Sequence, residues 1–155
     1  MLKILSFFIA LISISFCCTA SNNEYKNEML EVIRDIDDSL AKKDYESAVS
    51  SFSDKSVVNL YRDIDFHKYS KVEFKKILKD ALIKTSKYMI SRKILFSEFD
   101  LELESGKIVS LATESFEYDE VWEIHYSKET YYFSKEENEI RIVRLDLDSR
   151  TESIP

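Results

Sequence analysis

The spacing of the apolar residues changes once along this chain, near residue 88. Before that point apolar side chains recur every three or four residues, which is the period of an amphipathic helix. After it apolar and polar residues alternate, which is the period of a strand with one buried face. Helices gathered ahead of a run of strands are typical of an α+β domain, with the helices on one face of an antiparallel sheet.

Three helices are predicted in the first part. The first spans 24–41 and carries its apolar residues on one face. The second spans 45–52, with Asp44 as its N-cap. The third follows a capping-box pattern at Ser70 and is expected to run to about Tyr88.

The strands that follow are expected to be long and joined by tight turns. The alternation in 90–103 slips by one residue, as it does at a β-bulge. A turn at 104–107 would use Gly106, the only glycine, where positive φ costs little. Further long strands are expected at 107–118, 121–134 and 139–148. Two short strands, at 57–61 and 65–69, are expected earlier, between the second and third helices.

The first 20 residues have the pattern of an export signal. Lys3 precedes an apolar stretch, 4–16, that is shorter than the roughly 20 residues of a membrane-spanning helix. Small residues at Cys18 and Ala20 predict cleavage before Ser21. We therefore expect an exported protein that is periplasmic, secreted or anchored at the cell envelope.

Both cysteines, Cys17 and Cys18, lie in this signal, so cleavage after Ala20 leaves no thiol, disulfide or cysteine metal site. Alternatively, one of them becomes a lipid-bearing N-terminus, as in bacterial lipoproteins, although Phe16 is bulky for that motif. Such a lipid would be the only contact with a membrane. The predicted organisation is a signal at 1–20, a tether at 21–24, one domain at 25–148 and a frayed tail at 149–155.

Composition excludes several classes of function. Loss of Lys3 with the signal leaves 21 of the 22 Lys and Arg residues against 29 Asp and Glu, a net charge of −8. Such an acidic chain repels phosphate backbones, so no nucleic-acid partner is expected. One Gly and one Pro exclude glycine-rich phosphate loops and proline-rich linkers.

In the segment 40–58 a helix ends before Asp44, a short helix ends in the pattern Phe-x-Asp (Phe52 and Asp54), and a strand follows. This order resembles the nuclear transport factor 2-like superfamily, whose members tend to show the same pattern. The resemblance covers 25–148. It implies a cone-shaped, curved antiparallel sheet with three N-terminal helices packed on its concave face. The fold hosts isomerases, dehydratases, cyclases, transport factors and non-catalytic domains, so it says little about function.

The family pattern is not complete in this chain. Lys43 stands where a small residue usually precedes Asp44. Ketosteroid-isomerase-like members carry a catalytic aspartate and a tyrosine donor at positions that fall at or beside Leu60 and Ile36. Both residues are apolar, so that chemistry is not assigned to this chain.

The two histidines are the first candidates for catalysis. Neither has the spacing of a metal site, so no metal or other cofactor is expected. His67, with Asp63 nearby, is either a general base or part of an exposed polar edge. His125 would meet Glu114 across a hairpin with a two-residue turn, either as an acid/base pair or as an exposed cross-strand ion pair.

Aromatic residues crowd the two predicted strands from 107 to 134. The candidate ligand-binding residues among them are Phe116, Tyr118, Trp122 and Tyr126. Aromatic walls with tyrosine hydroxyls suit a small-molecule site. The same residues could instead form the packed core or a sheet-face interface of a homodimer.

The function favoured by the sequence is an exported, non-catalytic domain that binds a small apolar molecule or a protein partner in the cell envelope. One alternative is an isomerase, dehydratase or cyclase that uses an acid or base in a cavity. The other is a structural envelope lipoprotein.

Overall fold

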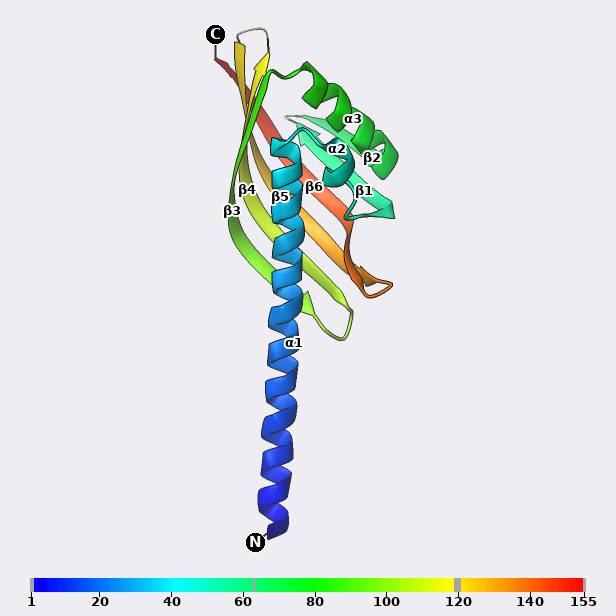
Figure 1. The fold of residues 1–155 in the computed structure, drawn as a ribbon, viewed down its shortest axis with the longest axis vertical. Helices are drawn as coiled ribbons and strands as arrows, with labels where there is room; N and C mark the ends of the chain where they lie inside the picture. Colours follow the sequence, from blue (N-terminus) through cyan, green and yellow to red (C-terminus); the bar gives the residue numbers. More distant parts are fainter. Residues whose placement is uncertain (1, 63, 119–120, 155) are drawn as a thin grey trace.

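The protein is described by a computed structural model that covers the backbone of residues 2–62, 64–118 and 121–154, and the side chains of 22–152 within those ranges. Three helices lie on one face of a curved, six-stranded sheet (Figure 1). The helices are α1 (Leu2–Ala41), α2 (Tyr45–Ala48) and α3 (Lys71–Lys84). This arrangement confirms the predicted α+β class with helices on the concave face.

The sheet has the strand order β2-β1-β6-β5-β4-β3. Its strands are β1 (Phe52–Arg62), β2 (Asp65–Ser70), β3 (Lys87–Asp100), β4 (Ser105–Tyr118), β5 (Val121–Glu136) and β6 (Glu139–Ile154). Every described pairing is antiparallel except that of β1 with β6, which is parallel. The predicted bulge is present in β3, between Ile94 and Phe96.

Helix α1 supplies one side of the hydrophobic core. Met29, Ile33, Ile36 and Leu40 are all buried, and their spacing places them on one face of the helix. Burying each such side chain contributes roughly 1.5–3 kcal/mol. The pattern of apolar residues in 24–41 therefore identified the packed face correctly.

Helices α2 and α3 are both shorter than the sequence predicts. Asp44 caps α2 by accepting from the Ser47 N–H, but the helix ends at Ala48, and β1 begins at Phe52. Helix α3 starts with the predicted capping box at Ser70 and ends at Lys84. Tyr88 therefore belongs to β3, because pairing with β4 outweighs continuation of the apolar helical pattern.

Gly106 does not form the turn predicted for it. The residue with positive φ near the β3–β4 connection is Glu104, at 45°, whereas Gly106 pairs with Phe99 inside the sheet. A Cβ atom on Gly106 would collide with the Met29 sulfur and lie 2.9 Å from a ring carbon of Phe99. The glycine is needed for close packing of α1 against the sheet.

The C-terminal tail is a strand rather than a frayed end. Strand β6 runs to Ile154, and its final residues pair with β5, as His125 does with Thr151. Backbone pairing on a central strand holds a segment whose polar composition alone suggested disorder.

No described helix combines the length and the apolar character needed to cross a membrane. The side chains of the predicted signal lie outside the described residues.

Candidate functional site

Strand alternation brings polar side chains onto the face that the helices cover. In β4 the residues Ile108, Ser110, Ala112 and Phe116 are buried on this face, and in β5 the odd-numbered residues from Ser127 to Phe133 are buried there. Polar residues at such positions need partners, because a desolvated polar group without one costs about 1–3 kcal/mol. They form two clusters, one around Arg92 and one around Glu114.

Arg92 of β3 is the centre of the first cluster. Its Nε lies 2.8 Å from Oδ2 of Asp37, and its Nη2 lies 2.7 Å from Oδ1 of the same carboxylate. Its Nη1 donates to Ser110 at 2.9 Å and also to Glu129. The guanidinium therefore joins α1, β3, β4 and β5.

The Glu129 carboxylate accepts further hydrogen bonds, whereas both oxygens of Asp37 bond to Arg92. Tyr131 donates its hydroxyl to Glu129 at 2.7 Å, and Ser127 donates to the other oxygen at 3.0 Å. The side chains of Arg92 and Glu129 are only 6% and 5% exposed. Burial opposes the charge of Arg92, but its contacts with the two carboxylates outweigh this and raise the pKa of the guanidinium. We name Arg92, Asp37, Glu129, Ser110, Ser127 and Tyr131 the arginine cluster.

Glu114 of β4 is the centre of the second cluster. It accepts a hydrogen bond from the Tyr88 hydroxyl at 2.5 Å. Burial raises the pKa of Glu114 to about 7, and the hydrogen bond from Tyr88 opposes this shift, whereas the charge of Glu129 adds to it. Burial and the neighbouring carboxylate also raise the pKa of Tyr88. Glu114 can therefore gain or lose a proton near neutral pH.

The predicted pairing of His125 with Glu114 is confirmed by the backbone. The two residues are direct partners across β4 and β5, and Tyr118 pairs with Val121 at the end of the hairpin. The His125 ring lies 4.7 Å from that of Phe116, and its Nε2 lies 3.3 Å from Oε2 of Glu123. Burial lowers the pKa of His125. We name Tyr88, Glu114, Phe116, Tyr118, Glu123 and His125 the glutamate cluster.

The other histidine does not join either cluster. His67 is exposed on the edge strand β2, where its ring stacks on Tyr69 with 6.0 Å between centroids. Asp63, its proposed partner, lies outside the described residues. Among the side chains that the structure describes, no group of three or more His, Cys, Asp or Glu residues is arranged to hold a metal ion.

The four candidate ligand-binding aromatics are divided between the two faces of the sheet. Phe116 and Tyr118 face the helices and stack with 6.1 Å between ring centroids. Trp122 and Tyr126 face the other way, where Lys87 and Arg150 lie over their rings at 5.8 and 5.1 Å. The structure therefore brings only Phe116 and Tyr118 together with His125 and Glu114.

Sequence reasoning did not select the arginine cluster. The available signal was a charged residue at an inward position of an alternating strand, namely Arg92 between Ile90 and Ile94, and Glu129 between Ser127 and Tyr131. Asp37 follows Ile36 at the edge of the apolar face of α1. Only the packing of that helix on β3 shows which of its several carboxylates meets Arg92.

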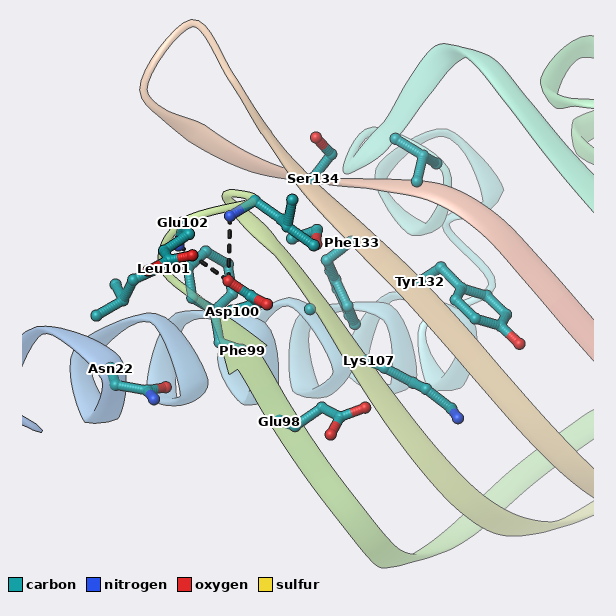
Figure 2. Close-up of a pocket in the computed structure, with 14 residues that line it drawn as sticks. Asn22, Glu98, Phe99, Asp100, Leu101, Glu102, Lys107, Tyr132, Phe133 and Ser134 are labelled. Atoms are coloured by element: carbon teal, nitrogen blue, oxygen red, sulfur yellow. Dashed lines mark hydrogen bonds between the residues drawn. The ribbon is translucent and has the colours of Figure 1, made fainter.

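A large open cavity lies at the opposite end of the sheet from the glutamate cluster. Its volume is about 1010 Å³, and it opens where the β3–β4 connection approaches α1 (Figure 2). Phe99 and Phe133 form apolar walls, and Glu98, Asp100 and Glu102 line it with carboxylates. Asp100 stabilises the β3–β4 connection, because its Oδ1 accepts hydrogen bonds from the backbone N–H groups of Glu102 and Leu103 at 2.9 and 3.1 Å. Neither polar cluster contributes to this cavity.

No protein-family model matches the chain, and no curated protein matches it. Several solved structures, however, are similar to this chain in fold. A candidate scytalone dehydratase from Novosphingobium aromaticivorans is 16% identical with a TM-score of 0.75, covering 88% of this chain and 92% of its own. A hexachlorocyclohexane dehydrochlorinase is 9% identical with a TM-score of 0.69, covering 85% and 90%.

A ketosteroid isomerase-like protein from Erwinia carotovora atroseptica is 12% identical with a TM-score of 0.63, covering 82% of this chain and 97% of its own. Several further similar structures are described only as proteins of unknown function, among them a nuclear transport factor 2-like protein from Pseudomonas putida. At these identities the likeness shows the fold alone, and that fold is nuclear transport factor 2-like.

Proposed function

We propose that this chain is an exported domain that binds a small, largely apolar molecule at the glutamate cluster. The observation that carries the proposal is the partial exposure of this cluster: Glu114, Tyr118 and His125 are only half-buried. Aromatic walls with a few convergent polar groups are the usual composition of small-molecule sites. Here the aromatic side chains are Phe116 and Tyr118, and the polar groups are Glu114 and His125.

The arginine cluster is the weaker place for a ligand. Arg92 already donates to two carboxylates and a serine, and Glu129 accepts further hydrogen bonds from two hydroxyl groups. A ligand would have to replace these charge-assisted bonds, each worth roughly 1.5–3 kcal/mol, without gaining better ones. In the half-buried glutamate cluster a ligand would compete with fewer contacts, the hydrogen bond of Tyr88 to Glu114 and the contact of His125 with Glu123.

The test is a fragment screen read by amide chemical shifts, with two matched variants. Tyr118→Ala removes a half-buried ring from the helix-covered face, and Tyr126→Ala removes one from the outer face. We expect fragments to shift amides of 114–118 and 123–125, and Tyr118→Ala alone to abolish the response. Equal loss in both variants would contradict the proposed location.

Mass spectrometry of the protein from its own cells tests export, through the absence of residues 1–20.

A second candidate function is proton transfer to or from the bound molecule. It is favoured by the pKa of about 7 for the Glu114 carboxyl, since general acids and bases work best near the operating pH. Fold neighbours described as a dehydrochlorinase and a dehydratase lend it support, at the level of fold only. Turnover of any fragment from the screen, lost in Glu114→Gln, would establish it.

A further inference from the structure

The chemical class of the ligand can be argued from the rings and charges around Glu114; this step rests on the proposed function. Phe116 lies at the centre of the aromatic groups, with ring centroids 5.0 Å from Tyr88, 6.1 Å from Tyr118 and 4.7 Å from His125. The faces of aromatic rings attract cations, and proteins use grouped aromatic rings to recognise quaternary ammonium ions. A carboxylate beside the rings adds a Coulomb attraction.

The charges near this cluster point the same way. The charged side chains on this face that approach it are Asp37, Arg62, Arg92, Glu114, Glu123 and Glu129. Four are carboxylates and two are guanidinium groups, and Arg92 is already shared between Asp37 and Glu129. Arg62 donates to Thr151 at the edge of the cluster. A ligand with negative charge would therefore meet net repulsion, and one with positive charge net attraction.

We propose that the glutamate cluster binds an organic ammonium ion with an apolar group, its charge held by the carboxylates of Glu114 and Glu123 and by the ring of Tyr118. Glu123 and His125 leave 35% and 22% of their side chains in contact with solvent, so an ammonium group can approach from this side. The apolar group of the ligand would cover Tyr118, which packs at the edge of the core.

Ammonium binding should be coupled to a proton on Glu114. The carboxyl has a pKa of about 7, so near neutral pH a cation that pairs with it displaces a proton. Affinity should then increase with pH through about 7 and level off above it. The pKa of His125 is lowered by burial, and a protonated His125 would repel the same ligand at low pH. The tyrosines Tyr88 and Tyr118, whose pKa values are raised by burial, stay neutral throughout this range.

Three probes of nearly equal size separate charge from shape: benzylamine, benzyl alcohol and benzoate. Each is titrated into the uniformly ¹⁵N-labelled protein, and the shifts of amides 114–118 and 123–125 are followed at several pH values from 5.5 to 8, as set by the pKa of about 7 for Glu114. At the upper end of this pH range we expect benzylamine to bind roughly three- to thirtyfold more tightly than benzyl alcohol. Benzoate should bind most weakly of the three probes.

Two variants assign the preference to Glu114. Glu114→Gln keeps an acceptor for the Tyr88 hydroxyl and should remove both the preference for benzylamine and most of its pH dependence. Glu98→Gln makes the same change at an exposed site in the distant cavity and should alter neither. Any pH dependence left in Glu114→Gln should disappear when His125→Gln is added.

The outcomes separate this inference from the proposed function. Equal binding of benzylamine and benzyl alcohol at these amides would overturn the ammonium inference and leave the proposed site standing. Tighter binding of benzoate would also overturn it. Benzylamine shifts confined to amides around Glu98, Asp100 and Glu102 would place cation binding in the distant cavity and overturn both.

Discussion

The two polar clusters share one face of the same sheet, yet they differ in how their charges are compensated. In the arginine cluster Asp37 and Glu129 share the guanidinium of Arg92, and hydroxyl groups satisfy the oxygens that remain. In the glutamate cluster the Glu114 carboxyl has one hydroxyl donor, Tyr88, and its pKa is raised by burial to about 7. The first cluster pairs its carboxylates with a cation, whereas the second can change its charge.

This difference shows why buried polar residues alone do not identify a functional site. A carboxylate that meets a cation in the folded protein keeps its charge and acts as a cross-link between elements. A carboxyl that meets only a neutral donor stays poised between two protonation states, which suits ligand binding and proton transfer. The two clusters therefore make opposite predictions for substitution and for pH.

Arg92→Met should have the largest effect. It leaves the buried carboxylate of Glu129 and the half-buried one of Asp37 without their shared cation, and breaking a buried ion pair in this way costs about 3–5 kcal/mol. Urea unfolding followed by circular dichroism measures the loss. Met has a similar length and an apolar side chain, so the loss reports the charge rather than a cavity. A cost below about 1 kcal/mol would mean that the arginine cluster is weakly coupled to folding.

Glu114→Gln should change the pH dependence of stability. The pKa of Glu114 is raised from 4.5 to about 7, so the folded state binds more protons than the unfolded state between these values. Stability from this group is present at low pH and is lost as pH rises through about 7, by at most about 3 kcal/mol. Urea midpoints at pH 5 and pH 8 should therefore differ less in Glu114→Gln than in the natural protein.

The two tyrosines offer a matched pair of hydroxyl deletions. Tyr131→Phe removes a donor from Glu129, which also accepts from Arg92, and should cost roughly 1.5–3 kcal/mol. Tyr88→Phe removes the donor of Glu114, which can take up a proton instead. Its cost should be smaller at low pH than at high pH, and the pKa of Glu114 should rise further. Equal, pH-independent losses would remove the distinction between the clusters.

Much of this arrangement could be predicted from the sequence, for local reasons. The helix face around Ile33, the cap at Ser70 and the pairing of Glu114 with His125 each depend on residues close together in the chain. The contact of Asp37 with Arg92 could not be predicted, because it joins residues 55 positions apart through the packing of α1 on β3. For the same reason the packing role of Gly106 against Met29 appears only in the folded chain.

His125→Gln should have the smallest effect on stability and the most informative one on binding. The contact of His125 with Glu123 is 3.3 Å long and partly open to solvent, so its loss should cost well under about 1 kcal/mol. Because burial lowers the pKa of His125 from 6.5, this ring is neutral in the folded protein above pH 7, and its replacement should leave stability there almost unchanged. Below that range the variant should lose the repulsion that a protonated ring exerts on a bound cation, so benzylamine should bind more tightly at pH 5.5 than to the natural protein. A stability loss as large as that of Arg92→Met would instead place His125 with the fixed, structural charges, and the contrast between the two clusters would fail.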